Sequence, residues 1–200
     1  MIHESDNGWN HNSHYHEFLL RALPRRCERA LDVGCGRGAF ARRLSAIAAH
    51  VDAIDYDSAT LAHARSESAG HSNITFTEAD FLSWPPAAPY DVVSMIATLH
   101  HLPFEAALGK AASLVRPGGT LIILGLDRQP FMLGAAHALV AFPVSWWHRF
   151  TRETTAVGAP IREPGMTLAE IRSRAGGIVP GAVFRRHLLW RYSMVFNRES

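Results

Sequence analysis

Apolar and polar residues along positions 30–126 follow two alternating patterns. Short runs dominated by apolar side chains are typical of β-strands, and we expect strands at residues 30–33, 51–55, 74–76, 90–97 and 120–126. Between these runs, apolar residues recur every three or four positions, which predicts helices that begin near Ala39, span residues 58–68 and span residues 104–115. Strands and helices that alternate in this way are typical of parallel βαβ units. This part of the chain therefore predicts a doubly wound α/β sheet.

The alternation ends at residue 126, and a segment of mixed apolar and basic character follows. Residues 131–147 are almost uncharged, but the run is shorter than the roughly 20 residues that cross a membrane, and it contains Pro143. We interpret residues 127–165 as a lid over a substrate site and expect no stable membrane insertion. Because basic residues flank the apolar run, weak peripheral contact with an anionic membrane surface is the alternative.

The last part of the chain predicts a helix and an antiparallel hairpin. Thr167 and Glu170 have the spacing of a capping box, and the helix that they open is expected to end at Gly176 and Gly177. Residues 182–188 and 190–196 suit two closely joined strands. Period-two alternation places four side chains on one face of the second strand: Trp190, Tyr192, Met194 and Phe196.

Length and charge limit the classes of protein to which this chain can belong. Its 200 residues suffice for one well-packed domain, in which residues 1–28 are expected to form an N-terminal helical cap. The net charge is +2 and the sequence contains no basic stripe, so we expect no nucleic-acid partner. Cys27 and Cys35 form no disulfide framework, and the first residues lack the apolar core of a signal peptide. A cytoplasmic location is therefore expected.

Three glycines at every second position follow the first predicted strand, in the segment LDVGCGRGA at residues 31–39. This spacing fits a strand that ends in a tight turn, with its backbone close to a ligand, before a helix begins. Gly34, Gly36 and Ala39 satisfy the dinucleotide fingerprint, so the turn alone does not distinguish NAD from S-adenosylmethionine. Asp55 ends the second predicted strand, where its carboxylate is placed to accept hydrogen bonds from the ribose of either cofactor.

Asp32, at the end of the first predicted strand, favours S-adenosylmethionine. The pyrophosphate of a dinucleotide is bound best by the amides of a helix N-terminus, with no carboxylate nearby. S-adenosylmethionine instead carries an ammonium and a sulfonium group, and an acidic side chain attracts both.

Together these residues resemble the class I S-adenosylmethionine-dependent methyltransferases of the small-molecule type. The resemblance extends over the glycine turn, the acidic ends of the second and third strands, the segments TLHHL and LVRPGG, and the closing hairpin. It implies a Rossmann-like sheet of seven strands in the order 3-2-1-4-5-7-6, with the last strand antiparallel and the lid between strands five and six. It also implies contacts to S-adenosylmethionine, or to its product S-adenosylhomocysteine, from Asp32, Gly34, Cys35, Gly36, Asp55, Tyr56, Asp80 and Phe81.

The methyl acceptor is expected to be a small, partly apolar molecule. The chain lacks the Asn/Asp-Pro-Pro-aromatic tetrad that nucleic-acid amino-methyltransferases carry after strand four, and ATLHHLP stands there instead. This segment resembles small-molecule O-, N- or C-methyltransferases, which implies that His100 and His101 lie beside the transferable methyl group. An imidazole suits a general base at neutral pH. We prefer His101, because consecutive side chains leaving a strand are expected to diverge and the later one has more freedom to turn towards the acceptor.

Two alternative functions remain open at this point. A non-catalytic S-adenosylmethionine-binding or regulatory protein would keep the cofactor residues without an acceptor pocket. An NAD-dependent oxidoreductase would require a hydride-transfer site, and the chain contains no Tyr-x-x-x-Lys pair. We interpret His11, His14 and His16 as solvated helix residues rather than metal ligands, so no metal site is expected. In the resembled family a leading helix often lies over the cofactor, which implies a contact from Tyr15 or His16.

Overall fold

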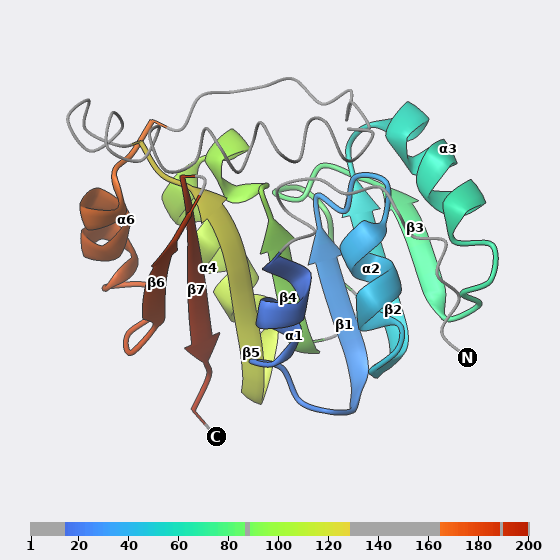
Figure 1. Cartoon of the computed structure of the whole chain (residues 1–200), viewed down its shortest axis with the longest axis horizontal. Helices are drawn as coiled ribbons and strands as arrows, with labels where there is room; N and C mark the ends of the chain where they lie inside the picture. Colours follow the sequence, from blue (N-terminus) through green and yellow to red (C-terminus); the bar gives the residue numbers. More distant parts are fainter. Residues whose placement is uncertain (1–14, 87–88, 129–164, 189, 200) are drawn as a thin grey trace.

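The computed structural model describes residues 15–86, 89–128, 165–188 and 190–199 (Figure 1). Within these residues, seven strands form one sheet in the order β3-β2-β1-β4-β5-β7-β6. The strands are β1 (Cys27–Val33), β2 (Ala48–Asp55), β3 (Ile74–Glu78), β4 (Tyr90–Ile96), β5 (Val115–Leu126), β6 (Val183–His187) and β7 (Arg191–Asn197). Strand β7 is antiparallel to both of its neighbours, β5 and β6, and the pairs from β3 to β5 are parallel. The predicted strand order and the antiparallel last strand are therefore confirmed.

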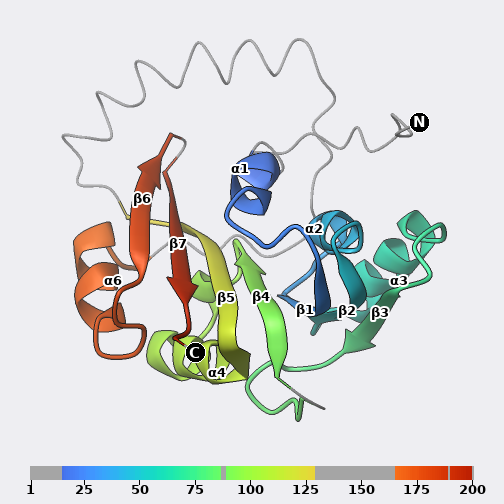
Figure 2. The same cartoon turned by 90° about the horizontal axis from the view of Figure 1, so that it is seen from below.

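Helices cover both faces of the sheet (Figure 2). They are α1 (His16–Leu20), α2 (Ala39–Leu44), α3 (Ser58–Glu67), α4 (Phe104–Leu114) and α6 (Leu168–Ala175), with a 3-10 turn η2 (Leu99–His101) after β4. Strand β5 shows how the two layers of core form, because Leu121 and Ile123 pack with the residues of α4 and α6. Ile122 and Leu124 on its other face pack with those of α1, α2 and α3. A strand buried on both faces explains the nearly continuous apolar run in the sequence.

Two predicted helix starts are confirmed in detail. Asp57 is the N-cap of α3, and its carboxylate accepts hydrogen bonds from the backbone N–H groups of Ala59 and Thr60. Thr167 and Glu170 form the predicted capping box at the start of α6. Each cap satisfies backbone donors that the first turn of a helix leaves without partners.

Several predicted boundaries are wrong by a few residues. Strands β1 and β2 begin at Cys27 and Ala48, three residues earlier than expected, because residues 27–29 and 49–50 are not buried and interrupt the apolar pattern. Strand β5 begins at Val115 and includes residues 116–119, which precede the strand expected at residues 120–126. Val115 pairs with Tyr90, and a register shift follows, so the segment of Pro and Gly is an irregularity inside the strand.

Trp190 does not share a strand face with Tyr192, Met194 and Phe196, which corrects the alternation predicted for the last strand. It precedes β7 and has a φ of 57°, a left-handed conformation that interrupts the two-residue period. The indole is 42% exposed, whereas Tyr192 and Met194 are buried in the core.

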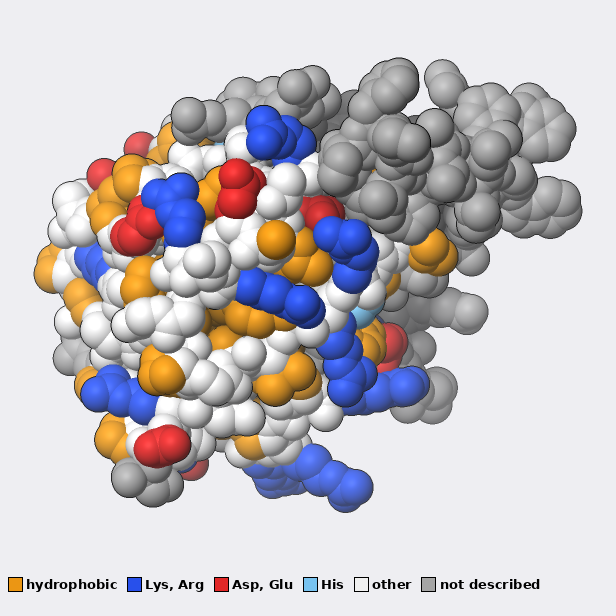
Figure 3. All heavy atoms as spheres, turned by 90° about the vertical axis from the view of Figure 1, so that its left-hand side faces the viewer, with side chains coloured by type: hydrophobic (Ala, Val, Ile, Leu, Met, Phe, Trp, Pro, Cys, Tyr) orange, Lys and Arg blue, Asp and Glu red, His pale blue; other side chains and the backbone are white. Residues whose placement is uncertain are grey.

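Strand β6 is one of the two edge strands of the sheet, and β3 is the other. Arg185 and Arg186 lie on β6, and the guanidinium of Arg172 from α6 stands 5.6 Å from the ring centre of Phe184. Figure 3 shows this side of the molecule, where Lys and Arg side chains border apolar ones. Charged side chains on an edge strand disfavour pairing with a strand of another molecule.

The predicted lid, residues 127–165, lies outside the described residues except for Asp127, Arg128 and residue 165. The same holds for residues 1–14 of the predicted N-terminal cap, of which α1 is described. The division of the chain into one domain with a cap and a lid stays a prediction. None of the described helices is long and apolar enough to span a membrane.

Candidate functional site

The glycine turn follows β1 at the carboxyl edge of the parallel strands. Gly34, Gly36 and Gly38 have φ values of 66°, 52° and 76°, a region that residues with a Cβ rarely adopt. The backbone N–H groups of Gly34 and Cys35 donate to the carbonyl of Ile54 at 2.8 and 3.0 Å, which ties the turn to the end of β2. The turn is thus held by the sheet itself.

The three glycines differ in what a Cβ would meet. At Gly38 it would lie 2.9 Å from the ring of Phe76 on β3, so this glycine allows helix and sheet to pack closely. At Gly34 it would lie 2.9 Å from the Cβ of Thr98, which follows β4. At Gly36 a Cβ would meet no atom of the described residues within 4 Å. The backbone of Gly36 therefore borders open space, as a turn that receives a ligand requires.

Asp55 accepts a backbone hydrogen bond on each of its carboxylate oxygens, one of them from the glycine turn. Oδ2 accepts a hydrogen bond from the backbone N–H of Gly36 at 2.8 Å, and Oδ1 accepts one from the N–H of Asp57 at 3.1 Å. Each carboxylate oxygen has a second lone pair for a ligand hydroxyl. Tyr56, the next residue, is 65% exposed. The sequence-predicted ribose pair thus lies beside Gly36.

Asp32 is a buried carboxylic acid with one unused oxygen. Oδ1 accepts a hydrogen bond from the hydroxyl of Ser94 on β4 at 2.7 Å. No donor among the described residues reaches Oδ2, although the side chain is buried. Burial, and to a smaller extent the charge of Asp55, raises the pKa of Asp32 to about 7, against the opposing effects of hydrogen bonds from Ser94 and from the backbone of Ala41. A ligand with an N–H donor or a positive charge would provide Oδ2 of Asp32 with an interaction partner.

Cys35 is a buried, small residue of the turn, in contact with the core beneath α2. Burial, with the nearby charges of Asp32 and Asp55, raises the pKa of its thiol far above the ordinary range. A thiol held protonated in this way is a poor nucleophile. The structure therefore gives Cys35 a packing role.

Asp80 and Phe81 follow β3 and differ in exposure. Asp80 is exposed and caps a short turn, where its Oδ1 accepts from the N–H of Leu82 at 3.0 Å. The ring of Phe81 is buried in the core with the residues of α4, and the ammonium of Lys110 lies 5.3 Å from its centre. Phe81 thus anchors the segment that carries Asp80. Their contacts with an adenine ring stay a prediction.

His100 and His101 lie together in η2, and both are half-buried. Their ring centres are 4.0 Å apart with a tilt of 40° between the planes. The expectation that the two side chains diverge is wrong, because the chain enters a 3-10 turn rather than continuing as a strand. The predicted divergence therefore gives no reason to prefer His101 over His100. The two imidazole rings pack against each other instead.

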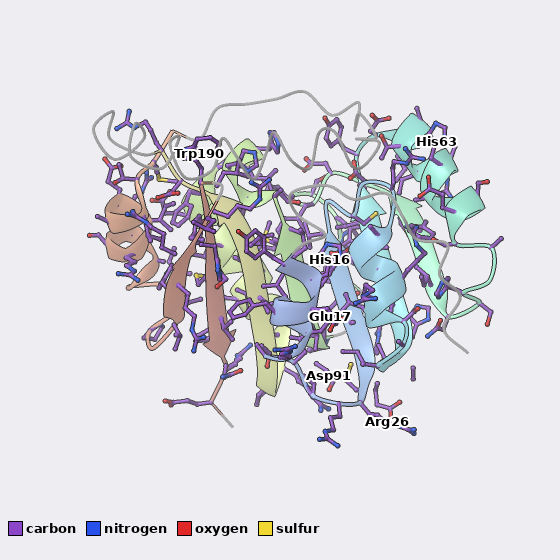
Figure 4. The ribbon with its side chains drawn as sticks, in the orientation of Figure 1. His16, Glu17, Arg26, His63, Asp91 and Trp190 are labelled. Carbon is purple, nitrogen blue, oxygen red and sulfur yellow. The ribbon has the colours of Figure 1, made fainter. Side chains whose placement is uncertain are left out.

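Tyr15 and His16 are buried in the contacts of α1, so the prediction that His16 is a solvated helix residue is wrong. The hydroxyl of Tyr15 donates to the carbonyl of Leu188 at 2.8 Å, and His16 lies edge-on to Phe40 of α2, with ring centres 5.0 Å apart. Figure 4 shows His16 and Glu17 on α1 in front of the sheet. His11 and His14 lie outside the described residues, and within those described no three His, Cys, Asp or Glu side chains gather as a metal site would require.

Sequence reasoning missed three residues of this edge. Ser94 is a small hydroxyl residue in the middle of the buried run YDVVSMI, and a polar residue inside a central strand is a usable signal. Asp127 is the first charged residue after β5, at an end where parallel sheets bind ligands, so its position was also informative. Thr98 carries no signal, because its contact with Gly34 spans 64 residues of sequence.

Comparison with known proteins finds methyltransferases among the relatives of this chain. The sequence profile of a family described as a methyltransferase domain matches residues 30–119. An uncharacterized methyltransferase of Mycobacterium bovis is 34% identical over 189 residues, which are 93% of this chain and 95% of that protein. A ubiquinone biosynthesis O-methyltransferase of Acinetobacter baumannii is 31% identical over 72% of this chain and 65% of its own length.

A solved structure with the same fold contains a ligand. It is the N-methyltransferase NodS from Bradyrhizobium japonicum WM9 in complex with S-adenosyl-L-homocysteine. The match has a TM-score of 0.66 and covers 98% of this chain and 94% of NodS, at 17% sequence identity.

Proposed function

The chain belongs to the class I S-adenosylmethionine-dependent methyltransferases, and from this premise we propose that it methylates an oxygen, nitrogen or carbon nucleophile of a small, partly apolar molecule. When bound, S-adenosylmethionine supplies an electrophilic methyl group on a sulfonium. The chain's own residues then have to hold the cofactor, align the acceptor and, where the nucleophile carries a proton, remove it. Alignment alone contributes much of the rate of such a displacement.

We assign the cofactor to the carboxyl edge around the glycine turn. The methionine and ribose portions of the cofactor would lie beside Asp32, Gly34, Cys35 and Gly36. Its ribose would contact Asp55 and Tyr56, and its adenine would contact Asp80 and Phe81. Two observations support the assignment: the unused buried Oδ2 of Asp32, and the open space next to Gly36. The first suits a positively charged amino group, and the second leaves room for the ligand.

The histidines of η2 are assigned to the acceptor side. His100 and His101 follow β4, next to the strand that carries the glycine turn, and the stacked pair is half-buried. A neutral imidazole there would accept the proton that a hydroxyl or a neutral amine nucleophile loses as it is methylated. We keep His101 as the candidate for this general-base role and make His100, whose ring packs against it, the alternative, which the two alanine variants distinguish.

A small acceptor is supported by the residues that follow β4. This segment reads ATLHHLP and lacks the Asn/Asp-Pro-Pro-aromatic tetrad of nucleic-acid amino-methyltransferases. The relatives do not agree on a nucleophile, because one is named an O-methyltransferase and a solved structure is titled an N-methyltransferase. The proposal therefore extends to a small acceptor molecule and leaves its nucleophilic atom open.

The open space at Gly36 carries this proposal, and calorimetry with S-adenosylhomocysteine tests it. We expect Gly36→Val to weaken binding by more than about tenfold, because a branched side chain would fill the ligand's place. Asp55→Ala is expected to weaken binding as well, since it removes the acceptor of the Gly36 N–H. Gly181→Val is a matched control, because Gly181 also has a left-handed φ, of 78°, and a Cβ there also meets no atom of the described residues within 4 Å.

Two results would contradict the assignment. One is unchanged affinity for S-adenosylhomocysteine in both Gly36→Val and Asp55→Ala, with unfolding midpoints showing that the variants fold. The other is binding of NAD without binding of S-adenosylhomocysteine, which would revive the oxidoreductase alternative.

A further inference from the structure

Asp127 is a second buried carboxylate with one unused oxygen. It directly follows β5, and its side chain has no exposed surface. Oδ2 accepts a hydrogen bond from a guanidinium nitrogen of Arg186 on β6 at 3.2 Å. No donor in the described part of the chain lies within hydrogen-bond distance of Oδ1. Most buried polar atoms in proteins have a partner, so this oxygen requires an explanation.

The position of Asp127 places it at the edge where the methyl group would be transferred. Strand β5 is parallel to β4, and η2, which follows β4 and holds the two histidines, contacts β5. Residues 121 and 123 of β5 belong to the same core cluster as Leu99 of η2. Arg186, the partner of Asp127, shares a face of β6 with Phe184, which packs against that same cluster, so Asp127 lies on this face of the sheet.

Charge and apolar surface around Asp127 define what would bind. Arg186 already compensates the negative charge of the carboxylate, so the missing partner of Oδ1 is a neutral donor rather than a second cation. The backbone N–H of Asp127 donates to the carbonyl of Trp190 at 3.1 Å, which makes the two residues neighbours. Trp190 offers an indole that is 42% exposed.

Trp190 is held in an unfavourable backbone conformation. Its φ is 57°, which is rare for a bulky residue, and such outliers concentrate at ligand-binding sites. In Figure 4 the side chain lies at the same end of the sheet as the turns that follow the parallel strands. An exposed aromatic ring beside an unused acceptor oxygen is suited to a molecule with an apolar body and one polar donor.

We propose that Asp127 and Trp190 form part of the acceptor site, and that the acceptor presents a neutral hydroxyl or N–H group to Oδ1 of Asp127. The inference rests on the proposed function, which it extends by naming the chemistry of the acceptor. Asp127 thereby selects acceptors that carry a donor group, because an analogue without one would leave the buried oxygen unpaired. Trp190 packs against the apolar part of the same molecule.

A pair of isosteric probes tests the inference. The protein is saturated with S-adenosylhomocysteine and titrated with phenol and, separately, with toluene, which replaces the hydroxyl by a methyl group. Binding is followed by NMR through the indole N–H of Trp190 and the backbone amide of Asp127. We expect phenol to bind about tenfold more tightly than toluene, as for a hydrogen bond to a charged group.

Variants show whether the preference for phenol depends on the carboxylate of Asp127 or only on the charge of the protein. Asp127→Leu should bind the two probes within about twofold of each other, since the acceptor oxygen is gone. Asp127→Asn keeps the shape and a weaker acceptor, so it tests the preference if the leucine variant fails to fold. Glu105→Gln is the control for loss of one negative charge, because Glu105 is exposed on α4 and pairs with Arg174. It should keep the full preference.

Three results would overturn the inference while the proposed function stands. They are equal binding of both probes by the wild-type protein, absence of binding by either probe at millimolar concentration, and a preference for phenol that persists in both Asp127 variants. Failure of S-adenosylhomocysteine to bind would instead contradict the proposed function.

Discussion

The side chain of Thr98 fills the place that a Cβ on Gly34 would need. Its hydroxyl lies 3.3 Å from the carbonyl of Gly34 and 3.1 Å from that of Ile96, as a donor to either. The carbonyl of Thr98 accepts a hydrogen bond from the backbone N–H of His101 at 3.0 Å. Ala97, the residue before it, has a left-handed φ of 53°. Thr98 thus joins the glycine turn to the histidine pair through two consecutive contacts.

Gly34→Ala and Gly36→Ala are predicted to impair different properties, the first mainly stability and the second mainly ligand binding. Both place a Cβ on a left-handed residue, at a cost of about 1–2 kcal/mol each. Gly34→Ala adds a collision with Thr98, so it should lower the free energy of unfolding more than Gly36→Ala does. Gly36→Ala fills open space and should chiefly weaken binding of S-adenosylhomocysteine. Denaturant unfolding and calorimetry on both variants check this.

A double variant isolates the contact between Thr98 and Gly34. Thr98→Gly removes the side chain that a new Cβ would strike, so Gly34→Ala/Thr98→Gly should be more stable than the sum of the single effects predicts. Strictly additive free energies of unfolding would show that the close approach has no energetic weight.

Asp32 is predicted to make stability depend on pH. Its pKa is raised to about 7 in the folded state, so the folded protein binds a proton more tightly than the unfolded chain does. Between about pH 4 and pH 7 the folded state therefore holds more protons, and stability falls as pH rises through this window, by up to about 1.4 kcal/mol per pH unit. Above pH 7 this contribution no longer changes.

Asp32→Asn mimics the protonated acid and should remove the contribution of Asp32 to the pH dependence of stability. The free energy of unfolding of the variant, measured from pH 4 to pH 8, should decline less steeply than that of the wild-type protein. Identical slopes would mean that Asp32 does not titrate in this range. The same substitution should weaken binding of S-adenosylhomocysteine at pH 8, where a charged carboxylate would otherwise attract the ligand's amino group.

The histidine pair gives a kinetic prediction. With any acceptor that is methylated in a panel of phenols and amines, His101→Ala should lower kcat by about 100-fold or more, as for loss of a general base. Affinity for S-adenosylhomocysteine should stay within a few-fold. His100→Ala removes the stacked neighbour of His101 and should lower kcat less. His63→Ala, at an exposed position on α3 (Figure 4), is the matched control. A normal kcat in His101→Ala at every pH would leave catalysis to alignment alone.

Local patterns were sufficient to predict most of the sheet. The apolar run at β4, the caps at Asp57 and Thr167, and the glycine turn each have a signal within a few residues of sequence. Strand order then followed from the resemblance to a known family. Where local signals were weak, as in the half-exposed starts of β1 and β2, boundaries were misplaced.

The finer geometry of the site depends on contacts between distant residues. The unused oxygens of Asp32 and Asp127, and the contact of Thr98 with Gly34, arise only when separate strands lie side by side. The stacking of His100 on His101 depends on a 3-10 turn, and the left-handed Trp190 on a hairpin turn, neither of which the alternation of apolar residues encodes. Period-two reasoning assumes that a strand continues, and it fails where the backbone turns.

The most direct test of the account is an NMR titration of the isotope-labelled protein with S-adenosylhomocysteine. We predict shifts in the backbone amides of Gly34, Gly36 and Asp57, which lie in or beside the turn that Asp55 holds. The amides of Glu28 and Arg29, which donate to Asp91 near the opposite edge of the sheet, should stay unchanged. Shifts confined to Glu28 and Arg29, or no shifts at saturating ligand, would contradict the assignment of the cofactor site.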